Sequence, residues 1–220
     1  LLYEQVNVQG TLHLLEACRL HGVGRMVLAS SSSVYGNNRK VPFAESDPVD
    51  NPISPYAATK KACELMAYTW HHLYGLSVSC MRFFTVYGPR MRPDMAIHKF
   101  ARLIMAGRPV PVYGDGTSRR DYTFIGDIVQ GLYAAVERCD GYHLYNLGES
   151  NTVELLHLIR LIEAALGHKA QLAFHPEQPG DVAVTFADIR LARTELDYRP
   201  ATPIEEGIIA FAEWFKSYYK

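Results

Sequence analysis

Helical and strand-like patterns alternate along this chain of 220 residues, and the alternation restricts its fold more than any other feature. Residues 4–21 carry apolar side chains at intervals of three and four, as in a helix, and residues 26–30 form an apolar run of strand length. Residues 55–74 and 76–84 repeat this order of helix and strand. Because alternating helices and buried strands pack as layers on a largely parallel sheet, the sequence predicts an α/β fold.

Residues that begin and end helices define several of these elements. Ser54 and Pro55 are typical of a helix start, with an N-cap hydroxyl before a proline in the first turn, and Gly75 is typical of a helix end. Residues 36–53 are rich in proline, asparagine and aspartate, which predicts a loop. Further helices are expected to begin at Asp94, at Asp127, at Asn151 or Thr152, and at a capping box from Thr202 to Glu205, with further strands over 109–114, 121–125 and 143–148.

The composition argues against several classes of protein and site. A formal net charge of −1 gives no overall attraction to nucleic acid or to an anionic membrane, and no apolar run approaches the length of about 20 residues that a membrane span needs. The four cysteines, Cys18, Cys63, Cys80 and Cys139, contain no CxxC pair, and the nine histidines show no paired spacing of metal ligands. We therefore expect a cytoplasmic protein with reduced cysteines and no metal site.

The most informative chemical pattern is Tyr56-Ala-Ala-Thr-Lys60 at the start of the helix over 55–74. Residues four apart share a helix face, so the phenol and the ammonium can converge on one point. A tyrosine of ordinary pKa, about 10, is a poor base at neutral pH, but a neighbouring cation and the positive end of the helix dipole both stabilise its phenolate. In a chain with 14 tyrosines the pair alone is weak evidence, because a surface pair has the same spacing by chance.

A run of serines, Ser30 to Ser33, follows the strand over 26–30 directly. Open α/β sheets bind ligands at the carboxyl ends of their strands, where hydroxyl groups can hydrogen-bond a substrate alcohol. A serine-rich turn is common by itself. The order of strand, serine cluster, loop and Tyr-x-x-x-Lys helix is much rarer, and it predicts a site in which a substrate hydroxyl meets Tyr56 and Lys60.

Taken together, these motifs resemble the extended short-chain dehydrogenase/reductase family, specifically its NAD-dependent epimerase/dehydratase branch. The matching stretches cover nearly the whole chain in the family's order: NVQGTLHLLEAC, VLASSSSVYG, PYAATK, MRFFTVYGPR, VYGDGTSRRDYTFIGDIVQG, YNLG and PGDVAVTFADI. The resemblance implies a Rossmann-type doubly wound parallel sheet with a smaller C-terminal substrate-binding lobe. It assigns residues 1–91 and 121–147 to the NAD-binding lobe and residues 92–120 and 148–220 to the nucleotide-sugar-binding lobe.

The same resemblance implies roles for individual residues. Tyr56 would be the base and acid on the sugar 4-hydroxyl, Lys60 would bind the nicotinamide ribose of NAD, and Ser31 would hydrogen-bond the reacting oxygen. Asn7 would lie near the bound cofactor. Substrate contacts are implied for Ser32, Ser33, Thr85, Arg92, Arg120 and Asp181, with Arg120 on the diphosphate.

Two places in the sequence bear on the reaction and the sugar. Relatives that dehydrate or decarboxylate the sugar usually hold a carboxylate in the turn that Ser32 and Ser33 occupy here, and a hydroxyl cannot replace that acid. The resemblance therefore favours 4-epimerisation through a transient 4-keto sugar. Thr85 and Arg92 resemble uronate epimerases, in which this arginine reaches the sugar carboxylate, since a guanidinium pairs with a carboxylate as a fork.

UDP-glucuronate and UDP-galacturonate are therefore the first substrates expected. A UDP-glucose 4-epimerase, a UDP-glucuronate decarboxylase or sugar dehydratase, and a non-catalytic nucleotide-binding relative remain as alternatives. Gln178 stands where relatives often place a ribose-binding arginine, which leaves the nucleotide base open.

The glycine-rich turn that a dinucleotide site requires is not found in this sequence. The family resemblance begins after the third or fourth strand of the Rossmann half, so about 80–100 residues of βαβ units are expected to be missing. We therefore expect this chain alone to bind NAD weakly and to be inactive. The full-length protein is expected to be a homodimer that pairs through residues 4–21 and 55–74.

Overall fold

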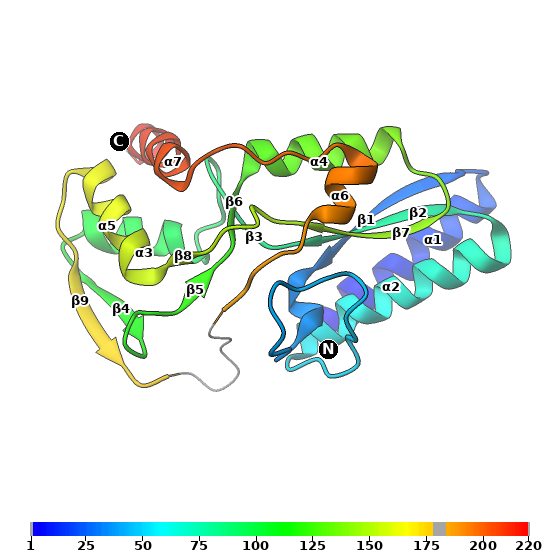
Figure 1. The fold of residues 1–220 in the computed structure, drawn as a ribbon, viewed down its shortest axis with the longest axis horizontal. Helices are drawn as coiled ribbons and strands as arrows, with labels where there is room; N and C mark the ends of the chain where they lie inside the picture. The colour runs from blue at the N-terminus through cyan, green and yellow to red at the C-terminus, as the bar shows by residue number, and fades with distance from the viewer. Residues whose placement is uncertain (1, 178–183, 220) are drawn as a thin grey trace.

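A parallel sheet of three strands organises one half of the molecule (Figure 1). The computed structural model describes residues 2–177 and 184–219. The sheet has the order β1 (Arg25–Ser31), β2 (Ser77–Phe83) and β7 (Tyr142–Leu147). Every residue from Val78 to Arg82 is buried, as expected for a strand with neighbours on both sides and helices on both faces. Ser31 lies opposite Phe83, so β1 and β2 end at the same edge.

Helices cover both faces of this sheet. The π-helical turn η1 (Glu4–Gln9), α1 (Gly10–Leu20) and α2 (Pro55–Tyr74) lie on one face, and α4 (Ile125–Glu137) and α6 (Arg190–Leu196) lie on the other (Figure 1). Leu15 and Val78 belong to the apolar cluster on the first face, and Ile128 and Leu147 to the cluster on the second. This arrangement confirms the α/β, Rossmann-type class that the sequence predicts.

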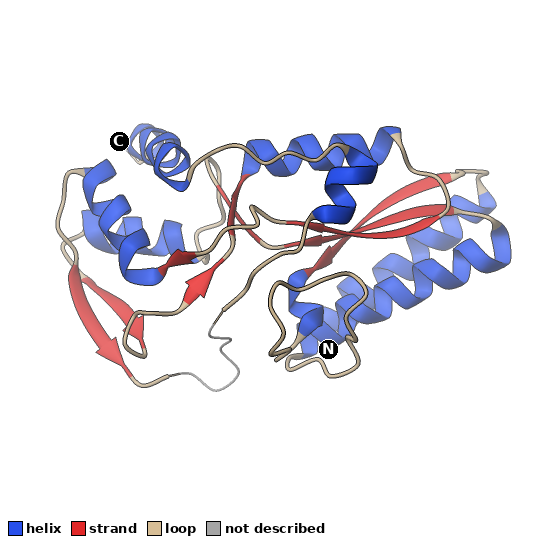
Figure 2. Cartoon of the chain, in the orientation of Figure 1, coloured by secondary structure: helices blue, strands red, loops and turns tan. Residues whose placement is uncertain are grey.

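Three further helices and short strand pairs form the other half of the molecule (Figure 2). They are α3 (Ala96–Met105), α5 (Leu155–Leu166), α7 (Ile204–Tyr218), the parallel pair β4 (Pro109–Tyr113) and β9 (Gln171–His175), and the antiparallel pair β5 (Arg119–Arg120) and β8 (Val153–Glu154). A further parallel pair consists of β3 (Thr85–Tyr87) and β6 (Tyr122–Phe124). Ile97, Leu158 and Phe211 belong to one apolar cluster that joins the three helices. No helix of the described residues is long and apolar enough to cross a membrane.

Local signals at α2 and in the loop before it behave as predicted. The Ser54 hydroxyl accepts a hydrogen bond from the Ala57 amide at 3.1 Å, and Gly75 ends α2 with φ 69°. The loop over 36–53 is held against the chain near Ala187: the Phe43 amide donates to the Phe186 carbonyl at 2.7 Å. The loop that leads from the serine turn to α2 therefore has a fixed path.

Two predicted helix starts are wrong because distant residues decide them. Residues 153–154, just after the predicted start at Asn151 or Thr152, pair with β5 as strand β8, and α5 begins at Leu155. The capping box at Thr202 does not form, and Pro203 is the N-cap of α7. The Asp127 carboxylate accepts the Thr202 amide at 3.2 Å, which removes the donor that a capping glutamate would need.

The two helix starts predicted at aspartates are also displaced, to Ala96 and Ile125. Met95 is the N-cap of α3, and Asp94 lies one residue outside it, paired with Arg92 at 3.3 Å. Asp127 lies inside the first turn of α4, after the N-cap residue Phe124. Both carboxylates remain near a helix start, where the helix dipole is favourable, but neither closes the first turn.

Candidate active site

Tyr56 and Lys60 lie on one face of α2 at its first two turns. The Lys60 Nζ atom is 5.9 Å from the centre of the Tyr56 ring, and both residues are half-buried. The same Nζ donates a hydrogen bond to the Ala29 carbonyl at 2.8 Å. The structure therefore brings the cation beside the phenol ring and ties the cation to β1, two residues before Ser31.

The serine run forms a short helical turn, η2 (Ser32–Tyr35), at the end of β1. Ser31 is its N-cap: the Ser31 oxygen accepts from the Ser33 amide at 3.1 Å, and its hydroxyl lies 3.1 Å from the Ser33 oxygen. Ser31 is buried, Ser32 half-buried and Ser33 exposed. A substrate hydroxyl that reaches Ser31 would thus replace Ser33 as its side-chain partner.

Gly36 closes this turn for a steric reason. It has φ 59°, and an added Cβ would clash with the Asn51 carbonyl of the loop that returns to α2. The glycine of the VYG motif therefore allows the turn and the loop before α2 to touch.

Asn7 packs against the same region of α2. Its amide nitrogen donates to the Thr59 hydroxyl at 3.0 Å, and its backbone carbonyl accepts from the Cys63 thiol at 3.3 Å. Thr59 directly precedes Lys60, so the structure brings Asn7 to the predicted catalytic pair.

The sequence did not predict a buried ion pair next to this site, between Arg82 and Glu64. Arg82 of β2 is 1% exposed and Glu64 of α2 is 0% exposed, and the guanidinium contacts both carboxylate oxygens at 2.9 Å. Burial opposes ionisation of Glu64, but the hydrogen bonds and charge of Arg82 outweigh it, so the pKa of Glu64 lies below its ordinary value. An arginine inside the apolar run 76–84 was the signal, because a buried charge requires a partner.

The other predicted substrate residues, Thr85, Arg92, Arg120 and Asp181, lie outside the serine turn. Thr85 begins β3 and is half-buried, with its amide bonded to the Asp121 carbonyl at 3.1 Å. The side chain of Arg92 is 74% exposed. Asp181, like the neighbouring Gln178, lies outside the described residues.

Arg120 lines a cavity of about 260 Å³ between α3 and β4. Lys99, Pro111 and Tyr113 also line it, as does Asp94, the ion-pair partner of Arg92. This cavity therefore combines two cationic side chains with a proline and an aromatic ring, and Arg92 lies at its margin.

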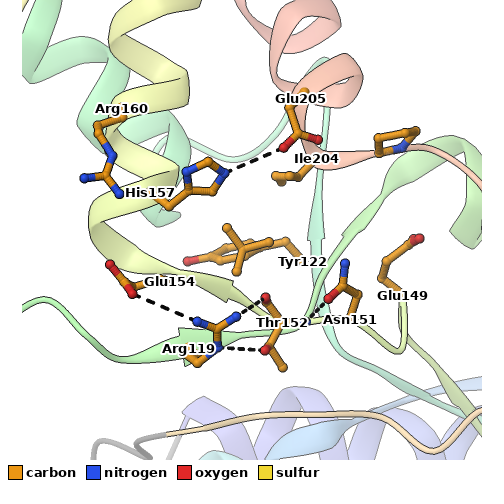
Figure 3. Close-up of a pocket in the computed structure, with 12 residues that line it drawn as sticks. Arg119, Tyr122, Glu149, Asn151, Thr152, Glu154, His157, Arg160, Ile204 and Glu205 are labelled. Carbon is orange, nitrogen blue, oxygen red and sulfur yellow. Dashed lines mark hydrogen bonds and ion pairs between the residues drawn. The ribbon is translucent and has the colours of Figure 1, made fainter.

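Arg119 lines a separate cavity of about 410 Å³ (Figure 3). Its guanidinium bonds the Thr152 hydroxyl and carbonyl, both at 2.8 Å, and across the cavity His157 pairs with Glu205 at 3.6 Å. Successive strand residues point to opposite sides, which explains why Arg119 and Arg120 face different cavities. Burial raises the pKa of Glu149, a further lining residue, to about 7, and negative charge on Asp127 adds to this effect.

Comparison with known protein families gives a match over nearly the whole chain. The family described as GDP-mannose 4,6 dehydratase matches residues 1–210. The chain belongs to the NAD-dependent epimerase/dehydratase family. The predicted family is therefore confirmed.

Individual members of this family are similar to the chain at the level of sequence and structure. It is 48% identical over 213 residues to an uncharacterized protein of Methanocaldococcus jannaschii, covering 97% of this chain and 65% of that protein. It is 44% identical over 216 residues to a UDP-glucuronate 4-epimerase of Thermodesulfobacterium geofontis, covering 98% of this chain and 66% of that enzyme. The chain thus spans about two thirds of the length of these relatives.

A solved family structure has the same fold. It is UDP-glucuronic acid 4-epimerase from Bacillus cereus in complex with UDP-glucuronic acid and NAD, with a TM-score of 0.90 and 34% identity. The alignment covers 97% of this chain and 68% of that one. Within the epimerase/dehydratase family, the group formed here by Tyr56, Lys60 and Ser31 is the natural candidate for the reacting site.

Proposed function

We propose that the full-length protein is a UDP-glucuronate 4-epimerase that works with bound NAD. The observation that carries the proposal is the position of the Lys60 ammonium, beside the Tyr56 ring and at the carboxyl end of β1, next to the Ser31 turn. A base, a cation and a hydroxyl donor are then available to one substrate alcohol. The similarity to enzymes of this name supports the same reaction.

Tyr56 takes the proton of the sugar 4-hydroxyl and later returns it, and the Ser31 hydroxyl donates a hydrogen bond to the oxygen on carbon 4. NAD, when bound, supplies the hydride acceptor for carbon 4 and the hydride donor for its opposite face. Lys60 fits the ribose end of such a cofactor, because an ammonium has three donors and one of them is used on the Ala29 carbonyl. Asn7, bonded to Thr59, lies on the same side of α2.

Epimerisation is favoured over dehydration and decarboxylation by the side chains of the η2 turn. Ser32 and Ser33 are the residues of this turn nearest to Ser31, and neither offers a carboxyl group. A hydroxyl of ordinary acidity cannot serve as the further acid or base that loss of water or carbon dioxide needs. The 4-keto sugar then has one outcome, return of the hydride and proton.

The nucleotide end of the substrate fits the cavity lined by Arg120. Arg120 and Lys99 supply positive charge for a diphosphate, and the side chains of Pro111 and Tyr113 offer an apolar surface on which the rest of the nucleotide can pack. Thr85 and Asp181 are proposed as further substrate contacts.

The choice of a uronate depends on Arg92. Its exposed side chain pairs with Asp94, which lines the same cavity. Such surface pairs contribute little, about 0–1 kcal/mol, so Arg92 can exchange Asp94 for a sugar carboxylate at small cost. If Arg92 stays paired with Asp94, no group selects a sugar carboxylate, and UDP-glucose 4-epimerisation is the second candidate.

We also propose two functional lobes: residues 1–91 and 121–147 for NAD, and 92–120 and 148–220 for the nucleotide sugar. The separate apolar cluster around α3, α5 and α7 supports the second lobe. Ala192 and Leu196 of α6 belong to the cluster on the central sheet, so α6 supports the first lobe by packing.

We propose that the protein is a cytoplasmic homodimer. Exposed apolar side chains on η1, α1 and α2 support pairing through residues 4–21 and 55–74; they include Val6, Leu14, Leu65 and Tyr68. All four cysteines are free thiols, and Cys63, Cys80 and Cys139 are buried, which fits a reducing compartment.

The variant Tyr56→Phe, made in the full-length protein, tests the reaction. It should lower the interconversion of UDP-glucuronate and UDP-galacturonate by about 10²–10⁴-fold, because the group that moves the proton is removed. Turnover is followed by chromatography of the two sugars, and the unfolding temperature should stay that of the parent protein. Tyr133→Phe, the same change at an exposed residue of α4, serves as the control. Unchanged turnover in Tyr56→Phe contradicts the assignment.

A further inference from the structure

Both partners of the buried pair Glu64 and Arg82 contact residues next to the candidate active site. Glu64 lies one helical turn after Lys60 on α2. Its Oε1 atom accepts a hydrogen bond from the Ser30 hydroxyl at 2.6 Å, while Lys60 donates to the Ala29 carbonyl at 2.8 Å. Two successive turns of α2 are therefore bonded to two successive residues of β1, directly before Ser31.

Arg82 extends these contacts to the serine turn. Its Nη1 atom donates to the Tyr35 hydroxyl at 3.0 Å, and Tyr35 is the last residue of η2. The Tyr35 hydroxyl donates in turn to the Asn146 side-chain carbonyl of β7 at 2.7 Å. One guanidinium thus joins α2, through Glu64, to the turn that carries Ser31.

Burying the charges of Glu64 and Arg82 costs desolvation free energy. Replacing a buried ion pair with apolar side chains of similar volume is often neutral or stabilising, so stability alone does not explain these charges. Directional bonds hold a helix against a strand at one register, whereas apolar contacts permit small shifts along the strand. A catalytic group displaced by about 1 Å can lose about 10²-fold in rate.

We propose that Glu64, together with Ser30 and Arg82, positions Tyr56 and Lys60 against the Ser31 hydroxyl. Glu64 is a positioning residue: it does not touch the substrate, and it acts through the register of α2 on β1. The inference rests on the proposed function in that Tyr56, Lys60 and Ser31 must act on one substrate oxygen.

Ser30→Ala is the variant that tests this role. Glu64→Gln is less suitable, because it leaves the Arg82 cation buried without a carboxylate and can fail to fold. Ser30→Ala keeps the ion pair and removes its hydrogen bond to β1. Ser79→Ala is the matched control: Ser79 lies in the same sheet, is 1% exposed against 3% for Ser30, and contacts the Cys139 thiol instead.

Two measurements are made on each variant. Hydrogen exchange of the amides over residues 55–64, without cofactor or substrate, should become faster in Ser30→Ala and stay unchanged in Ser79→Ala. In the full-length protein saturated with NAD, kcat of Ser30→Ala should fall by about tenfold or more, with KM for the UDP-sugar within about twofold of the parent, since geometry rather than binding is lost.

The proposal is overturned if Ser30→Ala keeps the kcat and the exchange rates of Ser79→Ala, or if KM rises while kcat is unchanged. Tyr56→Phe, measured in parallel, separates this failure from that of the proposed function. An inactive Tyr56→Phe with a fully active Ser30→Ala rejects the positioning role alone. An active Tyr56→Phe rejects the proposed function, and the exchange rates still decide whether Ser30 holds α2.

Discussion

Replacing Arg82 with methionine measures how much the buried ion pair contributes to folding, separately from its role in catalysis. The substitution removes the guanidinium that contacts both oxygens of Glu64 and the hydroxyl of Tyr35. Glu64 is 0% exposed, and after the substitution its described partners are Ser30 and Lys61, at 2.6 and 3.2 Å. A carboxylate with so little compensation must stay charged in a dry environment or take up a proton.

The expected loss follows from that geometry. Breaking a fully buried pair by removing one partner costs about 3–5 kcal/mol. In urea, this corresponds to a midpoint lower by roughly 1–2 M with an unchanged slope. The double variant Glu64→Met with Arg82→Met should cost only about 1–2 kcal/mol, because no charge remains buried and the loss is confined to the hydrogen bonds of Ser30 and Tyr35.

Urea unfolding followed by circular dichroism measures all of these values. Arg199→Met is the control, because Arg199 is an exposed arginine paired with Asp197 at 2.7 Å and should change stability by less than about 0.5 kcal/mol. The reasoning is refuted if Arg82→Met costs less than about 1 kcal/mol, or if the double variant loses as much as the two single variants added together. The double variant should also remain catalytically impaired although it is folded.

Three further predictions concern the sugar, the pH dependence of stability and the oligomeric state. Arg92→Ala should lower kcat/KM for UDP-glucuronate by about 10–100-fold and leave that for UDP-glucose unchanged, because a charge-assisted hydrogen bond is lost; equal effects on both sugars would refute the uronate assignment. Burial raises the pKa of Glu149 from 4.5 to about 7. Between these pH values the carboxyl group is protonated in the folded protein and ionised in the unfolded one, so the free energy of unfolding should fall as the pH rises. Glu149→Gln should remove part of this fall, a gain on the order of 1–3 kcal/mol at pH 8 over the parent that is absent at pH 4, and urea midpoints at both pH values check it. Leu65→Glu, at an exposed site on α2, should convert the dimer to a monomer in analytical ultracentrifugation, and an unchanged sedimentation coefficient would rule out this face.

The parts of the fold that depend on short stretches of chain were predictable. Ser54, Pro55 and Gly75 mark the ends of α2 because their hydrogen bonds and φ angles involve residues within one turn. Buried parallel strands follow from apolar runs, and the shared face of Tyr56 and Lys60 follows from helical spacing alone. Serines after β1 indicated the edge of the sheet at which the candidate site lies.

Elements that depend on distant partners were not predictable in this way. The start of α5 moved because Glu154 pairs with Arg119, and the capping box at Thr202 was lost because Asp127 binds its amide from 75 residues away.

By itself the sequence determined the α/β class, the family motifs and the helix that carries Tyr56 and Lys60, since each follows from the spacing of neighbouring residues. Only the tertiary structure decided that Glu64 meets Arg82 between that helix and the sheet, that Ser30 donates to Glu64, and which cavities Arg119 and Arg120 line. The physical reason is how far apart in the sequence the interacting residues lie. Backbone geometry and capping act within a few residues, whereas the partner of a buried charge is set by which strands and helices pack together.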